Sequence, residues 1–216
     1  MVSKWERLAP LAGVLAVPFW LMGVIFTSTK AKGSEGLEIL ASYQQHSDGI
    51  LVGALLWSIG VLLFIWFLGS LRSHLLAAER GDGRLANLAY GGGLVAAGIA
   101  LLIPAADEVG ALNKNDIDAS GASVLHHFSD AFFIATEYVL PILFFAVAIA
   151  AFRYAALPKW LAWLSVLIGV VLLIGPIGWA ALIFATPIWT LIVSILIWRR
   201  AEKPATTGEP AFATSI

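Results

Sequence analysis

The chain has 216 residues, of which 60% are hydrophobic and only 12% are charged. A soluble domain typically carries about 25% charged residues, so this composition excludes a soluble fold and predicts an integral membrane protein. The chain contains no cysteine, which excludes disulfides, thiolate metal sites and thiol nucleophiles.

Apolar runs predict six membrane-spanning helices packed in one all-α bundle. A run of about 20 residues crosses a hydrocarbon core of about 30 Å, because a helix rises about 1.5 Å per residue. The GPIG sequence at 175–178 predicts the reversal between the last two spans, since Gly and Pro permit tight turns. Residues 1–200 form the predicted transmembrane domain, and residues 201–216 are predicted to be a disordered tail. The predicted spans are 8–28, 49–71, 85–105, 129–154, 160–176 and 178–198.

If the chain crosses the membrane six times, its charged residues separate strongly between the two sides of the membrane. Both termini then share a side with the loops at 72–84 and 153–159, and this side holds 10 of the 13 Lys and Arg residues. Its net charge is +5 and that of the opposite side is −6, which together give the formal net charge of −1. Cytoplasmic loops of membrane proteins are enriched in Lys and Arg. Both termini are therefore predicted to be cytoplasmic, and the outer face is predicted to be acidic.

The outer segment 34–49, between the first two spans, is amphipathic. It predicts a short helix along the membrane surface, with Leu37, Leu40 and Tyr43 turned towards lipid. By contrast, His46 and His74 are predicted to be surface residues that belong to no site.

Small residues crowd one face of the third span. Such residues let a neighbouring helix approach closely, either within the bundle or from a second copy or membrane partner. No nucleic-acid partner is predicted, and the lipid bilayer is the expected surroundings. The residues of this face are Gly91, Gly92, Gly93 and Ala97.

Polar side chains near the outer ends of the third and fourth spans predict an outward-facing acidic cleft. If the fourth helix begins near residue 120, then His126, Asp130 and Glu137 share one stripe at about 100° per residue. If Ser129 is instead the N-cap, then Asp130 is an acid in the first turn and the histidines belong to a loop. The sequence leaves both arrangements open. The predicted site residues are Glu137, Asp130, His126, His127, Asp107 and Glu108.

Glu137 is unusual because it lies inside an apolar span, four residues before Pro141. Pro141 has no N–H, so the Glu137 carbonyl loses its usual partner and a kink is predicted there. A carboxyl group inside the hydrocarbon core is costly, and such groups often serve function.

Three interpretations of the cleft remain open. In the first, Glu137 only fixes helix packing in a structural or accessory subunit, through Thr27, Ser58, Tyr138 or Trp179. In the second, the cleft binds a cation, a proton or a small ligand in a non-enzymatic membrane protein. In the third, the His, Asp and Glu side chains serve a small intramembrane enzyme, although no HExxH or GxSxG motif is present. Neither a cofactor nor a particular metal is indicated.

Four phrases along the chain resemble a broad group of uncharacterised bacterial six-helix membrane proteins, catalogued as a domain of unknown function. The resemblance covers most of the length, and it implies a protein of the bacterial cytoplasmic membrane. It implies no activity and no functional residues. The phrases are ASYQQHSDGILVGALL, LRSHLLAAERGDGRLANLA, LPKWLAWLSVLIGVVLLIGP and PIWTLIVSILIWRR.

Overall fold

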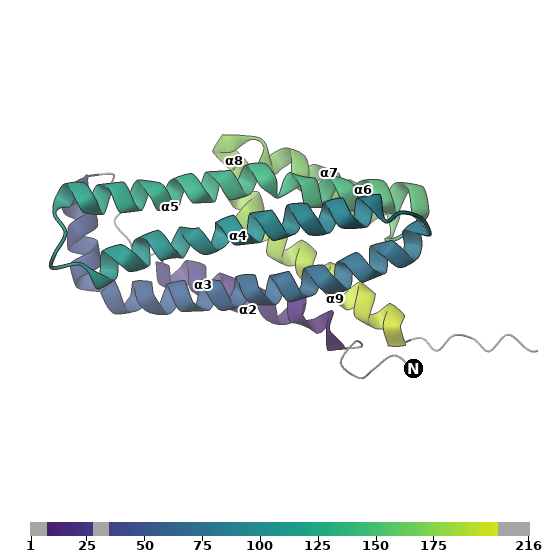
Figure 1. The fold of residues 1–216 in the computed structure, drawn as a ribbon, viewed down its shortest axis with the longest axis horizontal. Helices are drawn as coiled ribbons and strands as arrows, with labels where there is room; N and C mark the ends of the chain where they lie inside the picture. Colours follow the sequence, from purple (N-terminus) through teal and green to yellow (C-terminus); the bar gives the residue numbers. More distant parts are fainter. Residues whose placement is uncertain (1–7, 28–34, 203–216) are drawn as a thin grey trace, which may run out of the picture.

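A computed structural model describes residues 8–27 and 35–202 of the chain, with side chains as far as residue 200. These ranges are almost entirely helical and contain no strand, which confirms the all-α class for the described part (Figure 1). Lys4, Arg7, Ser28, Lys30, Lys32 and the predicted tail beyond residue 202 lie outside the described residues. The elements are α2 (Leu11–Thr27), α3 (Gly36–Glu79), α4 (Arg84–Leu112), α5 (Ala119–Val139), α6 (Pro141–Tyr154), α7 (Lys159–Leu172), α8 (Gly175–Ala180), the π-helix η1 (Ala181–Ala185) and α9 (Thr186–Glu202).

Four helical stretches are long and apolar enough to cross a membrane. They are Gly36–Glu79, Arg84–Leu112, Ala119–Tyr154 and Gly175–Arg200, while α2 and α7 are shorter apolar helices of 17 and 14 residues. Large apolar side chains are exposed on the outside of the bundle, as a lipid-facing surface requires, including Leu62, Trp66, Val95, Trp163 and Leu167.

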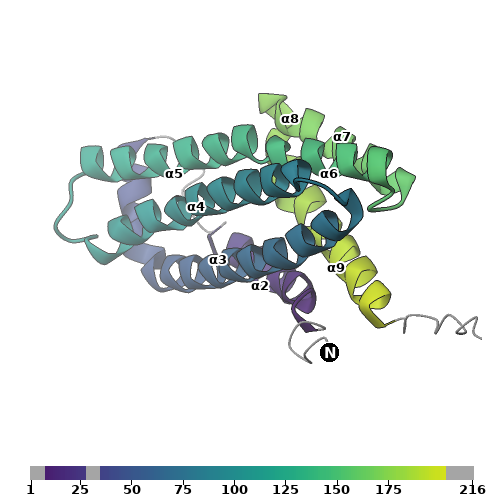
Figure 2. The same ribbon diagram turned by 45° about the vertical axis from the view of Figure 1, so that its right-hand side comes forward.

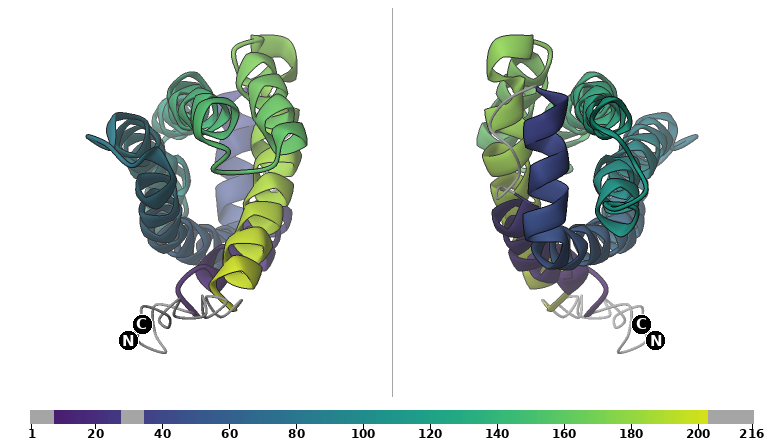
Figure 3. Two further views of the ribbon diagram at one scale, coloured as in Figure 1. Left: turned by 90° about the vertical axis from the view of Figure 1, so that its right-hand side faces the viewer. Right: turned by 90° about the vertical axis from the view of Figure 1, so that its left-hand side faces the viewer.

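The helices form a ring, seen end-on in Figure 3. Helix α2 packs between α3 and α9, α4 packs against α3, α5 and α6, and α7 packs against α6 and the α8–η1 segment. Trp189 of α9 is buried in the interior of the bundle, close to α7. Its ring meets that of Phe144 edge-on at 4.9 Å, and its indole N–H donates to Ser165 Oγ at 2.9 Å. The buried indole therefore keeps a hydrogen-bond partner, as buried Trp usually does.

The two ends of the ring differ in charge. The α3–α4 connection, the α6–α7 connection and the last turn of α9 lie at the end of the molecule where α2 begins (Figure 1). This basic end carries Arg72, Arg80, Arg84, Arg153, Lys159, Arg199 and Arg200. The opposite end, formed by the start of α3 and the α4–α5 connection, carries Glu38, Asp48, Asp116 and Asp118.

The small-residue face of α4 is used mainly inside the bundle. Gly92, Gly93 and Ala97 are buried, and an added Cβ would lie 2.6 Å from Ile142 of α6 at Gly92 and 2.8 Å from Leu68 of α3 at Gly93. Gly91 is half-buried, and a Cβ there would meet no atom within 4 Å. The contacts within the bundle thus account for three of the four small residues.

The reversal after α7 lies at Leu173 and Ile174, so the prediction of a turn at GPIG was wrong. Gly175 and Pro176 instead begin α8, with the proline in the first turn. The first N–H groups of a helix have no partner within it, so proline fits there at no cost in hydrogen bonding.

Helix α3 bends at His46, whose φ of −121° and ψ of 18° are not helical. Residues 36–45 consequently lie across the acidic end of the ring, roughly perpendicular to its long helices (Figure 1). The predicted helix is present, and Leu37 is exposed, but Tyr43 is buried, so the prediction that it faces lipid was wrong. Gly110 of α4 makes room for it, since an added Cβ there would lie 2.6 Å from Tyr43 Cζ.

Candidate functional site: a buried carboxylate network

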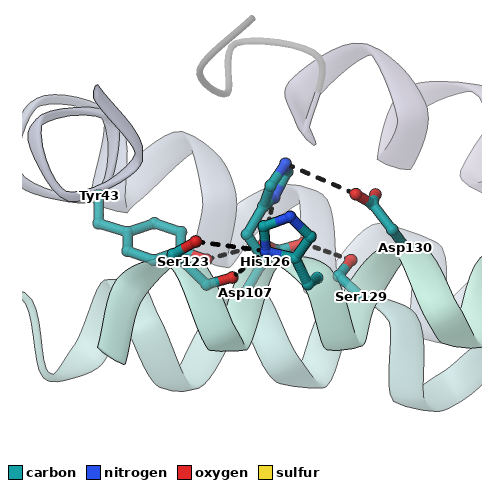
Figure 4. A network of polar contacts seen from close by, with 7 residues as sticks. Tyr43, Asp107, Ser123, His126, Ser129 and Asp130 are labelled. Carbon is teal, nitrogen blue, oxygen red and sulfur yellow. Dashed lines mark hydrogen bonds and ion pairs between the residues drawn. The ribbon is translucent and has the colours of Figure 1, made fainter. Parts of the chain in front are cut away.

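The centre of the site is Asp107 on α4, a carboxylate that is completely buried. The Tyr43 hydroxyl of α3 donates to Oδ1 at 3.0 Å, and the Ser129 hydroxyl of α5 donates to Oδ2 at 2.7 Å (Figure 4). These bonds satisfy both hydroxyls and both carboxyl oxygens, which would otherwise be buried without partners. One buried carboxylate thus ties three helices together at the acidic end.

Pro104 shapes α4 one turn before Asp107. Proline has no N–H, so the Ala100 carbonyl loses its helical partner. The Trp57 indole of α3 donates to this carbonyl at 2.9 Å in the buried interface. A second polar contact therefore holds α3 against α4 and fixes the position of the turn that carries Asp107.

Helix α5 begins well before the site, which decides between the two arrangements left open by the sequence. The Asp118 side chain caps it by accepting from the Gly121 N–H at 2.8 Å, as N-cap aspartates do. Ser129 is therefore inside the helix, and the alternative that placed it at the N-cap was wrong. His126 and Asp130 consequently lie one turn apart on the same helix.

His126 stands between a buried and an exposed carboxylate. Its Nδ1 lies 3.7 Å from Asp107 Oδ1, and its Nε2 lies 3.8 Å from Asp130 Oδ2 (Figure 4). These separations are too long for hydrogen bonds, so His126 lies beside both carboxyl groups without bonding to either. The Asp130 side chain is 61% exposed and so opens this end of the network to solvent. Within the described residues, no group of three or more His, Cys, Asp or Glu side chains is placed to hold a metal ion.

Three of the six predicted site residues do not join this network. His127 Nδ1 contacts the Ser123 carbonyl of its own helix at 2.7 Å, and Glu108 is half-buried and makes no hydrogen bond to the described residues of the network. Glu137 lies seven residues beyond Asp130, which is about 10 Å along the helix axis. The structure therefore brings together Asp107, His126 and Asp130 only.

Glu137 occupies a separate buried position beside α8. Only 3% of the residue is exposed, and its Oε2 would lie 2.9 Å from a Cβ added at Gly178. None of the hydrogen bonds between described residues involves its side chain, so none joins it to the partners predicted from sequence. The helical hydrogen bonding is interrupted before Pro141, where α5 ends at Val139 and α6 begins at Pro141. Leu140 between them keeps helical dihedral angles (φ −58°, ψ −30°), so the predicted kink stays a prediction.

Tyr43 and Ser129 are the site residues that the sequence analysis missed. Tyr43 was predicted to face lipid, and Ser129 was considered only as a possible helix cap. Ser129 could have been predicted from its spacing, because it lies three residues after His126 and residues three apart share a helical face. Tyr43 offered no such signal, since its burial depends on the bend at His46 and the gap at Gly110.

A cavity of about 130 Å³ lies directly beside the network. Its walls come from five elements, so it is a feature of the tertiary structure. One carboxylate, two hydroxyls and two aromatic rings are among its lining groups. The lining residues are Val24, Thr27, Trp57, Ile103, Pro104, Ser129, Asp130, Phe133 and Ile183.

Comparisons of the chain with protein-family models, with curated proteins and with solved structures gave no match. The class of the protein therefore rests on its own fold and site. It is an all-helical protein in its described part, with helices fit to cross a membrane and a buried carboxylate network at one end.

The Gly110→Ala variant should lower the free energy of unfolding by about 1–3 kcal/mol, the usual cost of overpacking. The new methyl group displaces the Tyr43 ring, so Asp107 also loses a hydrogen-bond donor. Reversible unfolding of the purified protein in mixed micelles measures the change. The matched control is Gly98→Ala on the same helix, where a Cβ meets no atom within 4 Å. Equal stability of the two variants would contradict the placement of Tyr43.

Proposed function

We propose that the chain is a non-enzymatic, six-span protein of the bacterial cytoplasmic membrane, with both termini in the cytoplasm. Its acidic end faces outward, and the cavity beside Asp130 binds a small organic cation of the ammonium class. The observation that carries the proposal is one carboxylate and two aromatic side chains, Trp57 and Phe133, on the walls of a single small cavity.

The threading is supported by the charges at the basic end. Lys and Arg concentrate on the cytoplasmic side of membrane proteins, so the basic end is the expected inner end. The short helices α2 and α7 would extend about 25 Å and about 21 Å at 1.5 Å per residue. Membranes accommodate such shorter apolar helices by local thinning or by anchoring of flanking residues.

The size and lining of the cavity favour an organic cation over a metal ion. An engineered apolar cavity of about 150 Å³ holds benzene, so about 130 Å³ suits a ligand of a few non-hydrogen atoms. An ammonium group is attracted both to a carboxylate and to the face of an aromatic ring. Metal ions require several ligands, and among the described lining residues Asp130 supplies the single carboxylate.

The test is ligand-dependent stability of the purified full chain, measured with methylammonium, trimethylammonium and tetramethylammonium at constant ionic strength. A ligand at ten times its Kd should stabilise the wild type by about 1.4 kcal/mol. The response should disappear in Asp130→Asn and persist in Glu108→Gln, an acid near the same end that does not line the cavity.

Two results would overturn this function. The first is an equal response to sodium and to the ammonium ions, since an aromatic wall gives sodium no comparable advantage. The second is no response to any cation in the wild type at pH 8. The network would then serve only to hold the helices together, as in the interpretation of the chain as a structural or accessory subunit.

A further inference from the structure

A second hollow, of about 620 Å³, lies at the basic end of the molecule, far from the carboxylate network. It is bounded by the start of α2, the last turns of α3 and the last turns of α9. Figure 2 shows that α9 runs obliquely to α3 and α4 towards this end. Nothing in the proposed cation site uses this hollow.

One side of the hollow is a stripe along α3. Trp66, Ser70, Ser73 and Ala77 recur at spacings of three and four residues, so they lie on one helical face. The stripe is apolar at one end and polar at the other. Trp66 is apolar and 69% exposed, whereas Ser70 and Ser73, nearer the end of the helix, carry hydroxyls. Gly69 leaves additional room, since an added Cβ there meets no atom within 4 Å.

The polar end of the hollow is built around one backbone carbonyl. Arg200 Nη1 donates to the Ala156 carbonyl oxygen at 2.6 Å, and His74 Nε2 lies 2.9 Å from the same oxygen. Both groups line the hollow. His74 is half-buried and belongs to this cluster, so the prediction that it is a free surface residue was wrong.

The guanidinium of Arg200 is held by the Ala156 carbonyl. Arginine has five N–H donors, and among the described residues the Arg200 Nη1 meets the Ala156 oxygen and, at 3.3 Å, His74 Nε2. No carboxylate whose side chain the structure describes lies within ion-pair distance of Arg200. A fixed arginine beside an apolar wall at the basic end matches an anionic head group attached to an acyl chain.

We propose that this hollow binds an anionic phospholipid of the inner leaflet. Its phosphate contacts Arg200 and the hydroxyl of Ser70, and its acyl chain lies along Trp66. Phosphate is recognised by arginine through paired N–H donors. Basic pockets between helices on the cytoplasmic side of membrane proteins bind acidic lipid head groups in the same way.

The experiment measures thermal stability and lipid retention of the delipidated full chain after addition of phosphatidylglycerol, phosphatidylcholine or inorganic phosphate. Phosphatidylglycerol should stabilise the wild type and should remain bound in native mass spectrometry. The Arg200→Gln variant should need at least tenfold more of this lipid for the same shift. The matched control is Arg199→Gln, the neighbouring arginine that does not line the hollow, and it should respond like the wild type.

A second variant removes the binding space without removing charge. Gly69→Leu places a side chain in the open hollow and leaves Arg200 and its bond to Ala156 unchanged. It should lose the lipid response while retaining the unliganded stability of the wild type. The proposal is overturned if this variant responds normally, if phosphatidylcholine is equally effective, or if inorganic phosphate alone gives the full shift.

Discussion

Replacement of Asp107 by alanine should lower the free energy of unfolding by more than about 3 kcal/mol. The Tyr43 and Ser129 hydroxyls would remain buried without their acceptor, and each unsatisfied group costs about 1–3 kcal/mol. The cavity left by the carboxylate adds to this loss. Reversible unfolding in mixed micelles, followed by circular dichroism, measures the effect.

The matched control for this variant is Asp130→Ala. It also removes a carboxyl group of the network, but from a side chain that is 61% exposed. Its stability should change by less than about 0.5 kcal/mol, as is usual for surface substitutions. A double-mutant cycle of Tyr43→Phe with Ser129→Ala should reveal coupling, because both donate to Asp107. A small loss for Asp107→Ala, similar to that of Asp130→Ala, would refute the network.

Gly23→Ala should be the most damaging single methyl addition in the packing of α2 against α3. The new Cβ would lie 2.8 Å from the backbone N and Cα of Trp57, which cannot rotate away. Overpacking typically costs 1–3 kcal/mol, and a contact with backbone should reach about 3 kcal/mol. The same unfolding assay measures it, with Gly91→Ala as the control in open space.

This variant should also weaken the proposed cation site. Val24 and Thr27, which follow Gly23 on α2, line the cavity beside Asp130. A shift of α2 away from α3 therefore widens the cavity and separates its walls. The ammonium response should fall together with stability in Gly23→Ala, whereas Gly91→Ala should preserve both. Wild-type stability of Gly23→Ala would contradict the close approach of the two helices.

Several features of the fold were predictable because they depend on local sequence. Apolar runs identify helices fit to cross a membrane, and Pro141 breaks the helix at the residue where its missing N–H requires it. The sorting of Lys and Arg predicted one basic end, and seven of the eight described Lys and Arg residues lie there, with Lys114 at the opposite end. The reversal after α7 was misplaced, because the same Gly and Pro residues that end a helix also fit the first turn of the next one.

The site was only partly predictable, because helical periodicity relates residues on one helix but not residues on different helices. His126 and Asp130 share a face of α5 wherever that helix packs, so their proximity follows from spacing alone. The burial of Asp107 and Tyr43 depends on the bend at His46 and on the space left by Gly110. The sequence by itself determined the helices, their apolar character and the separation of charge between the two ends. The tertiary structure decided which acids meet, because packing between helices, and not spacing along them, brings hydroxyl donors to Asp107 and leaves Glu137 apart.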